Sequence, residues 1–104
     1  MIPPTLKIGA HTFLVHQVEK NDLSDSNIAA CIDRDRQIIT IPADAPASRQ
    51  LELTLHECVH AMLEGHDLGD KEELVCVLLG QSLALFIMDN PKFFSDALKT
   101  LRRS

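Results

Sequence analysis

The sequence predicts an α+β fold in which a small sheet precedes a group of helices. Two observations support this prediction. Short strand-like segments separated by turn and loop residues make up the chain as far as Ile41, and helical periodicity dominates it from Ser48 onward. Strands that come first and helices that follow are typical of α+β proteins. A length of 104 residues fits one domain, residues 1–104, built around a single core.

The predicted sheet is small and antiparallel, with about three or four strands. The strands are expected at residues 6–8, 13–18, 28–32 and 37–41. Gly9 lies between the first two, and its backbone freedom suits the turn of a hairpin. The charged segment 33–36 forms the turn of the second pair, and the polar segment 21–27 is expected to be the loop between the pairs.

Helices are expected after Pro46, which suits a first helical turn. Their predicted ranges are 48–64, 71–88 and 92–101. The second is apolar on most sides, which predicts a central position in the fold. The third is short and amphipathic, with an apolar side expected to face inward. That side consists of Phe93, Phe94, Ala97, Leu98 and Leu101.

Composition and charge exclude several classes of function. The net charge of −5 argues against a nucleic-acid-binding module, which normally carries a basic surface. The three cysteines form no C-x-x-C pair, which indicates reduced thiols and a cytoplasmic location. The first residues lack the pattern of an export signal. The longest nearly apolar run, residues 74–88, is shorter than the ~20 residues that cross a bilayer, so no membrane partner is expected.

The chemically informative segment is an H-E-x-x-H motif made by His56, Glu57 and His60. At ~100° per residue, the two histidines lie on one face of a helix, separated by about 40°. Two imidazoles one turn apart can reach a single zinc ion. Glu57 lies about 100° from His56, beside the metal, where it can accept a proton from water.

A catalytic zinc needs a third protein ligand and an open position for water. His66 lies ten residues after His56, as in the metzincins, but Leu63 occupies the position of the glycine in their motif. The alternatives are Glu72 and Glu73 at the start of the following helix. A glutamate ligand from that helix is the gluzincin arrangement.

The segment Glu-Glu-Leu-Val-Cys-Val-Leu-Leu at residues 72–79 follows the motif helix. With that helix it resembles the short phage-type zinc metallopeptidases and the wider ImmA/IrrE-like group, over about residues 38–88. The resemblance implies a minimal zincin-like, gluzincin-like fold and one Zn²⁺ held by His56, His60 and Glu72. Glu73 and His66 remain alternatives to Glu72 as the third ligand.

The resemblance also implies a hydrolase that cleaves peptide bonds in a peptide or protein substrate. Glu57 would be the catalytic general base that takes a proton from zinc-activated water. The substrate is expected to pair as an added strand along residues 37–41, taken as an edge of the sheet. The oligomeric state is left open.

The sequence contains no tyrosine to stabilise an oxyanion, so four other side chains are candidates for that role. These candidates are His11, His16, Arg49 and His66.

Two functions other than catalysis also fit the sequence. One is a binding or regulatory module that keeps the metal for folding. The other is a metal-free helical interaction protein.

Overall fold

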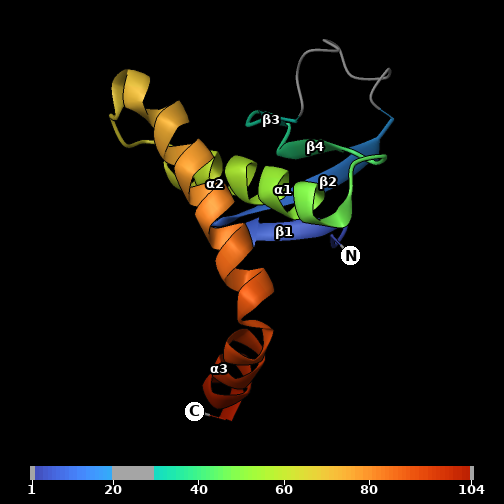
Figure 1. The fold of residues 1–104 in the computed structure, drawn as a ribbon. Coiled ribbons are helices and arrows are strands. Elements are labelled where there is room, and N and C mark those ends of the chain that lie inside the picture. Colours follow the sequence, from blue (N-terminus) through green and yellow to red (C-terminus); the bar gives the residue numbers. More distant parts are fainter. Residues whose placement is uncertain (1, 20–29, 104) are drawn as a thin grey trace.

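The computed structural model describes residues 2–19 and 30–103 of the chain. The strands are β1 (Thr5–Ile8), β2 (His11–Val18), β3 (Cys31–Asp33) and β4 (Ile38–Pro42). The helices are α1 (Ala47–Met62), the 3₁₀ turn η2 (Gly69–Lys71), α2 (Glu72–Asp89) and α3 (Pro91–Arg103). The predicted α+β layout, with strands before helices, is therefore confirmed (Figure 1). The predicted loop 21–27 and the first two residues of the predicted strand 28–32 lie outside the described residues.

The four strands form one sheet in the order β1-β2-β4-β3. β1 and β2 form the predicted hairpin, and Gly9 in its turn has a positive φ of 61°. β3 and β4 are also antiparallel, but β2 and β4 run parallel to each other. The sheet is therefore mixed, whereas the sequence predicted an antiparallel one. The difference arises because the β3–β4 hairpin pairs with β2 through its second strand, β4.

β4 is an interior strand of the sheet, which corrects the prediction that residues 37–41 form an edge. It pairs with β2 on one side and with β3 on the other. Its apolar character explains this place, since Ile39 and Ile41 are both fully buried. β3 has only three residues and ends at the exposed Asp33, features that suit an edge strand. In the described part of the chain, the edges of the sheet are β1 and β3.

The core lies between one face of the sheet and α1. β2 alternates in burial, so Phe13 and Val15 face α1 while Leu14 points to the opposite, solvated face. Buried side chains from the sheet and from α1 form one cluster: Ile8, Phe13, Val15, Ile39, Ile41, Leu53 and Cys58. The side chain of Gln50 donates to the carbonyls of Pro42 and Ala43, which ties the start of α1 to the end of β4.

α2 crosses α1 and packs on it along one narrow stripe (Figure 1). The buried residues of α2 are Cys76, Gly80 and Ala84. The sequence predicted a central position for this helix, and that prediction is wrong, because most of the surface of α2 is not buried. Leucines on its other sides are half exposed, such as Leu78 at 53%.

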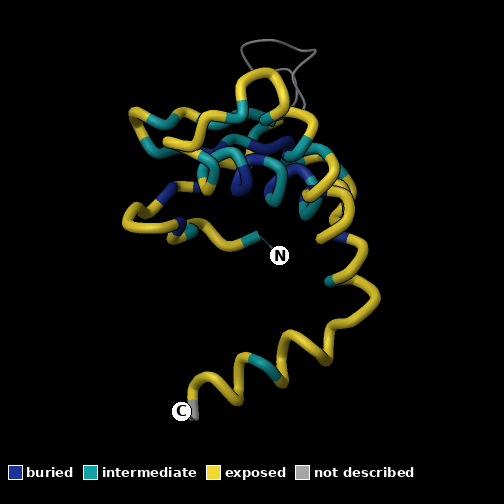
Figure 2. Tube along the Cα trace, turned by 90° about the vertical axis from the view of Figure 1, so that its left-hand side faces the viewer, coloured by how far each residue is buried: buried dark blue, intermediate teal, exposed yellow. Residues whose placement is uncertain are grey.

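α3 leaves the body of the molecule at an angle of 87° to α2 (Figure 2). Phe86, Phe93 and Phe94 form edge-to-face pairs at this corner, with ring centroids 5.3–5.9 Å apart. The predicted inward side of α3 faces solvent instead, since Phe93 is 59% and Leu98 50% exposed. That prediction is corrected because a right-angle turn at Asn90 carries α3 away from the core.

Among the described residues, no single helix is both long and apolar enough to cross a membrane. α2 and α3 reach the length and apolar composition of a membrane-crossing segment only when they are taken together as one bent pair.

Candidate metal centre

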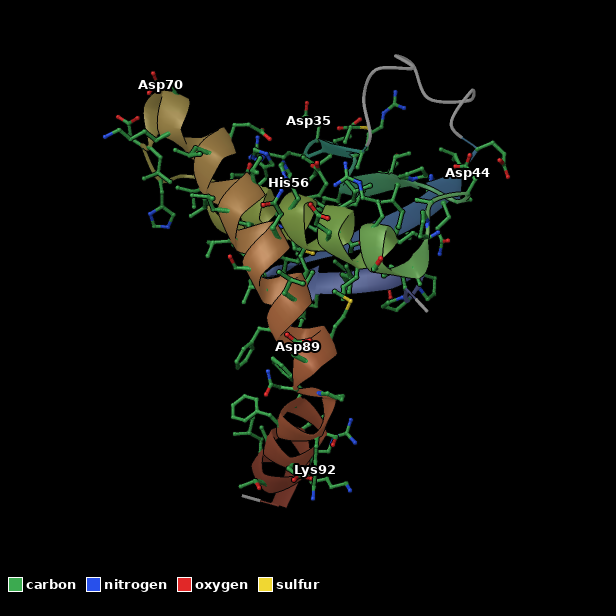
Figure 3. The ribbon with its side chains drawn as sticks, in the orientation of Figure 1. Asp35, Asp44, His56, Asp70, Asp89 and Lys92 are labelled. Carbon is green, nitrogen blue, oxygen red and sulfur yellow. The ribbon has the colours of Figure 1, made fainter. Side chains whose placement is uncertain are left out.

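His56 and His60 project from the same side of α1 toward the start of α2. Their rings lie one helical turn apart, with centroids separated by 5.0 Å, and both are largely buried. His56 is at the point where α2 crosses α1 (Figure 3). The predicted placement of two imidazoles on one helix face is therefore confirmed.

The carboxylate of Glu73, in the first turn of α2, bridges the two histidines. Its Oε1 lies 2.7 Å from Nε2 of His56, and its Oε2 lies 3.0 Å from Nε2 of His60. One ligand atom from each residue falls within 4.8 Å of the others. Within residues 2–19 and 30–103, this is the group of three side chains able to hold a metal ion.

The donor set of this group fits zinc. Imidazole nitrogens and a carboxylate oxygen are its usual ligands, and tetrahedral binding at ~2.0–2.1 Å separates ligand atoms by about 3.4 Å. The contacts of 2.7 and 3.0 Å are close to that separation. A small outward movement of the Glu73 carboxylate, which is exposed, would therefore accommodate the ion.

Glu72, which the sequence favoured as the third ligand, is not part of this group. Its Oε2 lies 2.7 Å from Nδ1 of His60 and 3.3 Å from a terminal nitrogen of Arg34. The hydrogen bond from His60 lowers the pKa of the Glu72 carboxyl, and burial opposes this effect. A hydrogen bond from Arg34 and electrostatic interactions with both residues lower the pKa further. Because an ionised carboxylate only accepts hydrogen bonds, Nδ1–H of His60 donates to Glu72. The geometry thus gives Glu73, the alternative ligand, the position facing both Nε2 atoms.

Arg34 connects the sheet to both helices at this centre. It lies in the turn between β3 and β4, and its Nη2 donates to the backbone carbonyl of His60 as well as to Glu72. A positive charge near the carbonyls that end α1 also interacts favourably with the helix dipole. Sequence reasoning treated residues 33–36 only as a turn. No spacing could reveal this role, because it depends on how the β3–β4 hairpin packs against α1.

Glu57 is buried and lines a cavity of about 330 Å³ together with His56 and Glu73. Burial raises the pKa of its carboxyl, and the charge of Glu73 acts in the same direction. Electrostatic interactions with His56, His60 and Arg34 oppose that rise. A carboxyl group in these surroundings can hold a proton more readily than an exposed one can.

The cavity continues along the α1–α2 groove into a second hollow of about 390 Å³. Arg49, Glu52 and Gln81 line both hollows, and Arg49 forms an ion pair with Glu52 at 3.0 Å. Arg49 therefore lies along the groove and lines the same cavity as His56. The other oxyanion candidates are His11, His16 and His66, and none of them lines either cavity. His66 is exposed, and the ring of His11 contacts Gln37.

Gly80 allows α2 to approach α1 beside the metal ligands. A Cβ at this position would lie 3.2 Å from the carbonyl oxygen of Glu52 and 3.3 Å from Cα and Cβ of His56. Sequence reasoning did not single out Gly80. A lone glycine inside an otherwise apolar helix was the available signal, since it often marks close backbone packing.

The cysteines near the centre are structural. Cys58 faces the core, as predicted, and Cys76 is fully buried between α2 and α1. Burial raises the pKa of each of these thiols to about 11. Neither thiol is therefore ionised enough near neutral pH to act as a nucleophile.

Comparison with protein-family models, curated proteins and solved structures gives no match for the chain. What supports a metal centre is therefore the arrangement of His56, His60 and Glu73 itself.

Proposed function

We propose that the protein is a zinc-dependent peptidase. His56, His60 and Glu73 hold one zinc ion, and Glu57 acts as the general base. The observation that carries the proposal is the convergence of two Nε2 atoms on one carboxylate beside a cavity that Glu57 lines. Three protein ligands next to an open cavity are typical of catalytic zinc sites, whereas structural sites are closed by four.

The ligand set explains the choice of metal. Two imidazoles and one carboxylate suit zinc better than calcium or magnesium, which prefer oxygen ligands throughout. Bound there, zinc would supply Lewis-acid chemistry, polarising the scissile carbonyl and lowering the pKa of water.

Glu57 would move the proton during hydrolysis. Its carboxylate accepts a proton from the attacking water and delivers it to the leaving amine. Burial raises its pKa, which supports this dual role because the protonated form must persist long enough to act as an acid.

Glu72 and Arg34 would orient His60 rather than bind the metal. The bond from Nδ1–H of His60 to Glu72 leaves Nε2 of that ring available as a ligand. Arg34 holds Glu72 in place by its second hydrogen bond. Carboxylate partners of this kind fix the tautomer and the ring orientation of histidine ligands.

A peptide substrate would lie in the groove between α1 and α2. β3 is an edge strand beside this groove, and Ala30, just before it, lines the first hollow. β3 can therefore pair with an extended peptide as an added strand.

Arg49 is the candidate to donate to the developing oxyanion, since it lines the cavity with His56. Met88 and Leu85 in the second hollow favour an apolar substrate side chain.

The test is Glu57→Gln, measured for zinc content and for cleavage of a quenched-fluorescence peptide library. The variant keeps the ligands, so we expect one zinc per chain, as in the wild type. Cleavage should fall by roughly 10²–10⁴-fold, the usual contribution of a general base. Glu64→Gln, at an exposed position just beyond α1, is the matched control and should retain full activity.

Wild-type cleavage by a zinc-loaded Glu57→Gln variant would overturn the mechanism. A wild-type protein that binds zinc but cleaves no member of the library would favour the metal-stabilised binding module instead.

A further inference from the structure

We infer that the protein forms a homodimer in which α3 of each copy packs on the outward face of α2 of the other copy. This inference is independent of the proposed catalytic function.

The outward face of α2 is apolar and exposed. Leu74 and Leu78 lie on the side of the helix opposite its contact with α1, and each is more than half exposed. Further exposed apolar side chains flank these two leucines on α2: Leu79, Leu83 and Phe86. A helix that is apolar on all sides is normally buried on all sides. A continuous apolar face of this length, unlike scattered single residues, marks an interaction surface.

α3 provides a second apolar face of matching character. Phe93, Phe94 and Leu98 lie on one side of the helix and are 39–59% exposed. Lys92, Lys99 and Arg102 lie on the other side. α3 is therefore an amphipathic helix whose apolar side chains are exposed in a single copy. Figure 2 shows the trace of α3 coloured as exposed along almost all of its length.

The two apolar faces cannot cover each other within one chain. Only Asn90 separates α2 from α3, and the helices meet at 87°. The Phe86, Phe93 and Phe94 cluster packs inside this corner and holds the angle. Folding α3 back along α2 would break that cluster. The α3 helix of a second copy meets no such obstacle, and a twofold axis creates the contact twice.

Charge also favours a second copy as the occupant. Residues 91–103 contain four basic residues and one acidic residue, while the rest of the chain contains six basic and fourteen acidic. The net positive charge of α3 therefore favours its association with the acidic body of another copy. The same acidic body would be repelled by an anionic lipid surface, the other partner that a basic amphipathic helix can recognise.

The dimensions are adequate for a stable interface. At about 1.5 Å per residue, the 18 residues of α2 span roughly 27 Å and the 13 residues of α3 roughly 20 Å. Two reciprocal contacts between helices of these lengths are of the order needed to bury the roughly 800 Å² per partner found in stable complexes.

The test is sedimentation equilibrium of the full chain and of three glutamate variants at several loading concentrations. We expect the wild type to have about twice the monomer mass of 11.6 kDa. Leu78→Glu on α2 and Leu98→Glu on α3 should each give a monomer with wild-type helical circular dichroism. The matched control is Leu14→Glu, a leucine 47% exposed on the far face of the sheet, which should leave the dimer intact.

A wild-type monomer at all concentrations would overturn the inference, including a monomer that sediments with anionic vesicles. A dimer that Leu78→Glu dissociates but Leu98→Glu does not would overturn the α2–α3 contact, since it would require α2 to pack on α2. A dimer that survives both substitutions would place the interface elsewhere and would also overturn it.

Discussion

Glu72 and Glu73 are neighbours in the sequence but have different partners in the structure. Successive residues of a helix point about 100° apart, so only one of two adjacent carboxylates can face the Nε2 atoms. That carboxylate is Glu73, while Glu72 contacts the opposite nitrogen of His60. In the proposed centre, one glutamate would bind the ion and the other would orient a ligand.

Replacing each glutamate by glutamine separates these two roles. Glu72→Gln should weaken zinc binding by about 10–100-fold, the usual effect of losing a partner of a ligand. Glu73→Gln should weaken it more, because it removes a charged ligand. Competition with a chromophoric chelator measures both affinities on the same scale. A larger loss for Glu72→Gln than for Glu73→Gln would reverse the two assignments.

The buried thiols allow an independent check of the packing around the centre. A thiol with a pKa of about 11 is ionised in only about one molecule in a thousand at pH 8, and ionisation rises tenfold with each pH unit. Cys31 is partly exposed, so it should react first with a disulfide reagent in the native protein. Cys58 and Cys76 should react slowly at pH 8, faster toward pH 10, and as fast as Cys31 in urea. Three equal rates in the native protein would contradict the described burial.

At the scale of elements, the centre depends on the close packing of α2 on α1. Gly80 lies against the backbone of Glu52 and His56, so the spacing of the helices is set within one turn of a metal ligand. The turn between β3 and β4 contributes Arg34 from the other side. The candidate metal centre therefore lies where three elements meet: α1, α2 and the turn between β3 and β4.

Gly80→Ala tests this packing. The added Cβ would be crowded at 3.2–3.3 Å by backbone atoms, which cannot move as a flexible side chain can. Overpacking costs about 1–3 kcal/mol and alanine regains about 1 kcal/mol of helix propensity, so a net loss of roughly 1 kcal/mol is expected. Urea unfolding measures this loss.

Zinc affinity should fall as well, because α2 carries Glu73. Ser82→Ala, at an exposed position of the same helix, is the control and should be neutral or slightly stabilising. A Gly80→Ala variant with higher stability and unchanged zinc affinity would show that the close contact of Gly80 with α1 neither stabilises the fold nor positions Glu73.

The elements were more predictable from the sequence than the way they pack. Periodicity located all three helices, and a glycine marked the first hairpin, because these signals are local. The parallel pairing of β2 with β4 was missed, since the sequence pattern of a strand does not show which strand lies next to it. The choice between Glu72 and Glu73 could not be predicted, because it depends on how α2 is rotated about its own axis. The contacts of Arg34 could not be predicted either, because they depend on how the β3–β4 hairpin packs on α1.

At the scale of the whole molecule, the fold is less compact than its length suggests. The Cα radius of gyration is 14.4 Å, whereas about 13 Å is usual for a chain of this size. The projecting α3 explains the difference (Figure 2). The sequence could not predict this projection, because an amphipathic pattern shows that a helix covers an apolar surface but not which one. The proposed dimer supplies that surface.

Zinc bound as we propose would affect the whole molecule, because it would link α1 to α2. Binding to the folded state alone stabilises it, so the melting temperature should rise when zinc is added to the metal-free protein. The rise should be absent in His60→Ala. Equal melting temperatures for the wild type with and without zinc would show that the ion does not join the two helices.

Elemental analysis of the purified wild type and of His60→Ala tests the central claim most directly. The wild type should contain one zinc ion per chain, and His60→Ala should contain little or none, because two remaining ligands hold zinc weakly. Equal zinc contents in the two proteins, or no zinc in a wild type supplied with the metal, would contradict the metal centre.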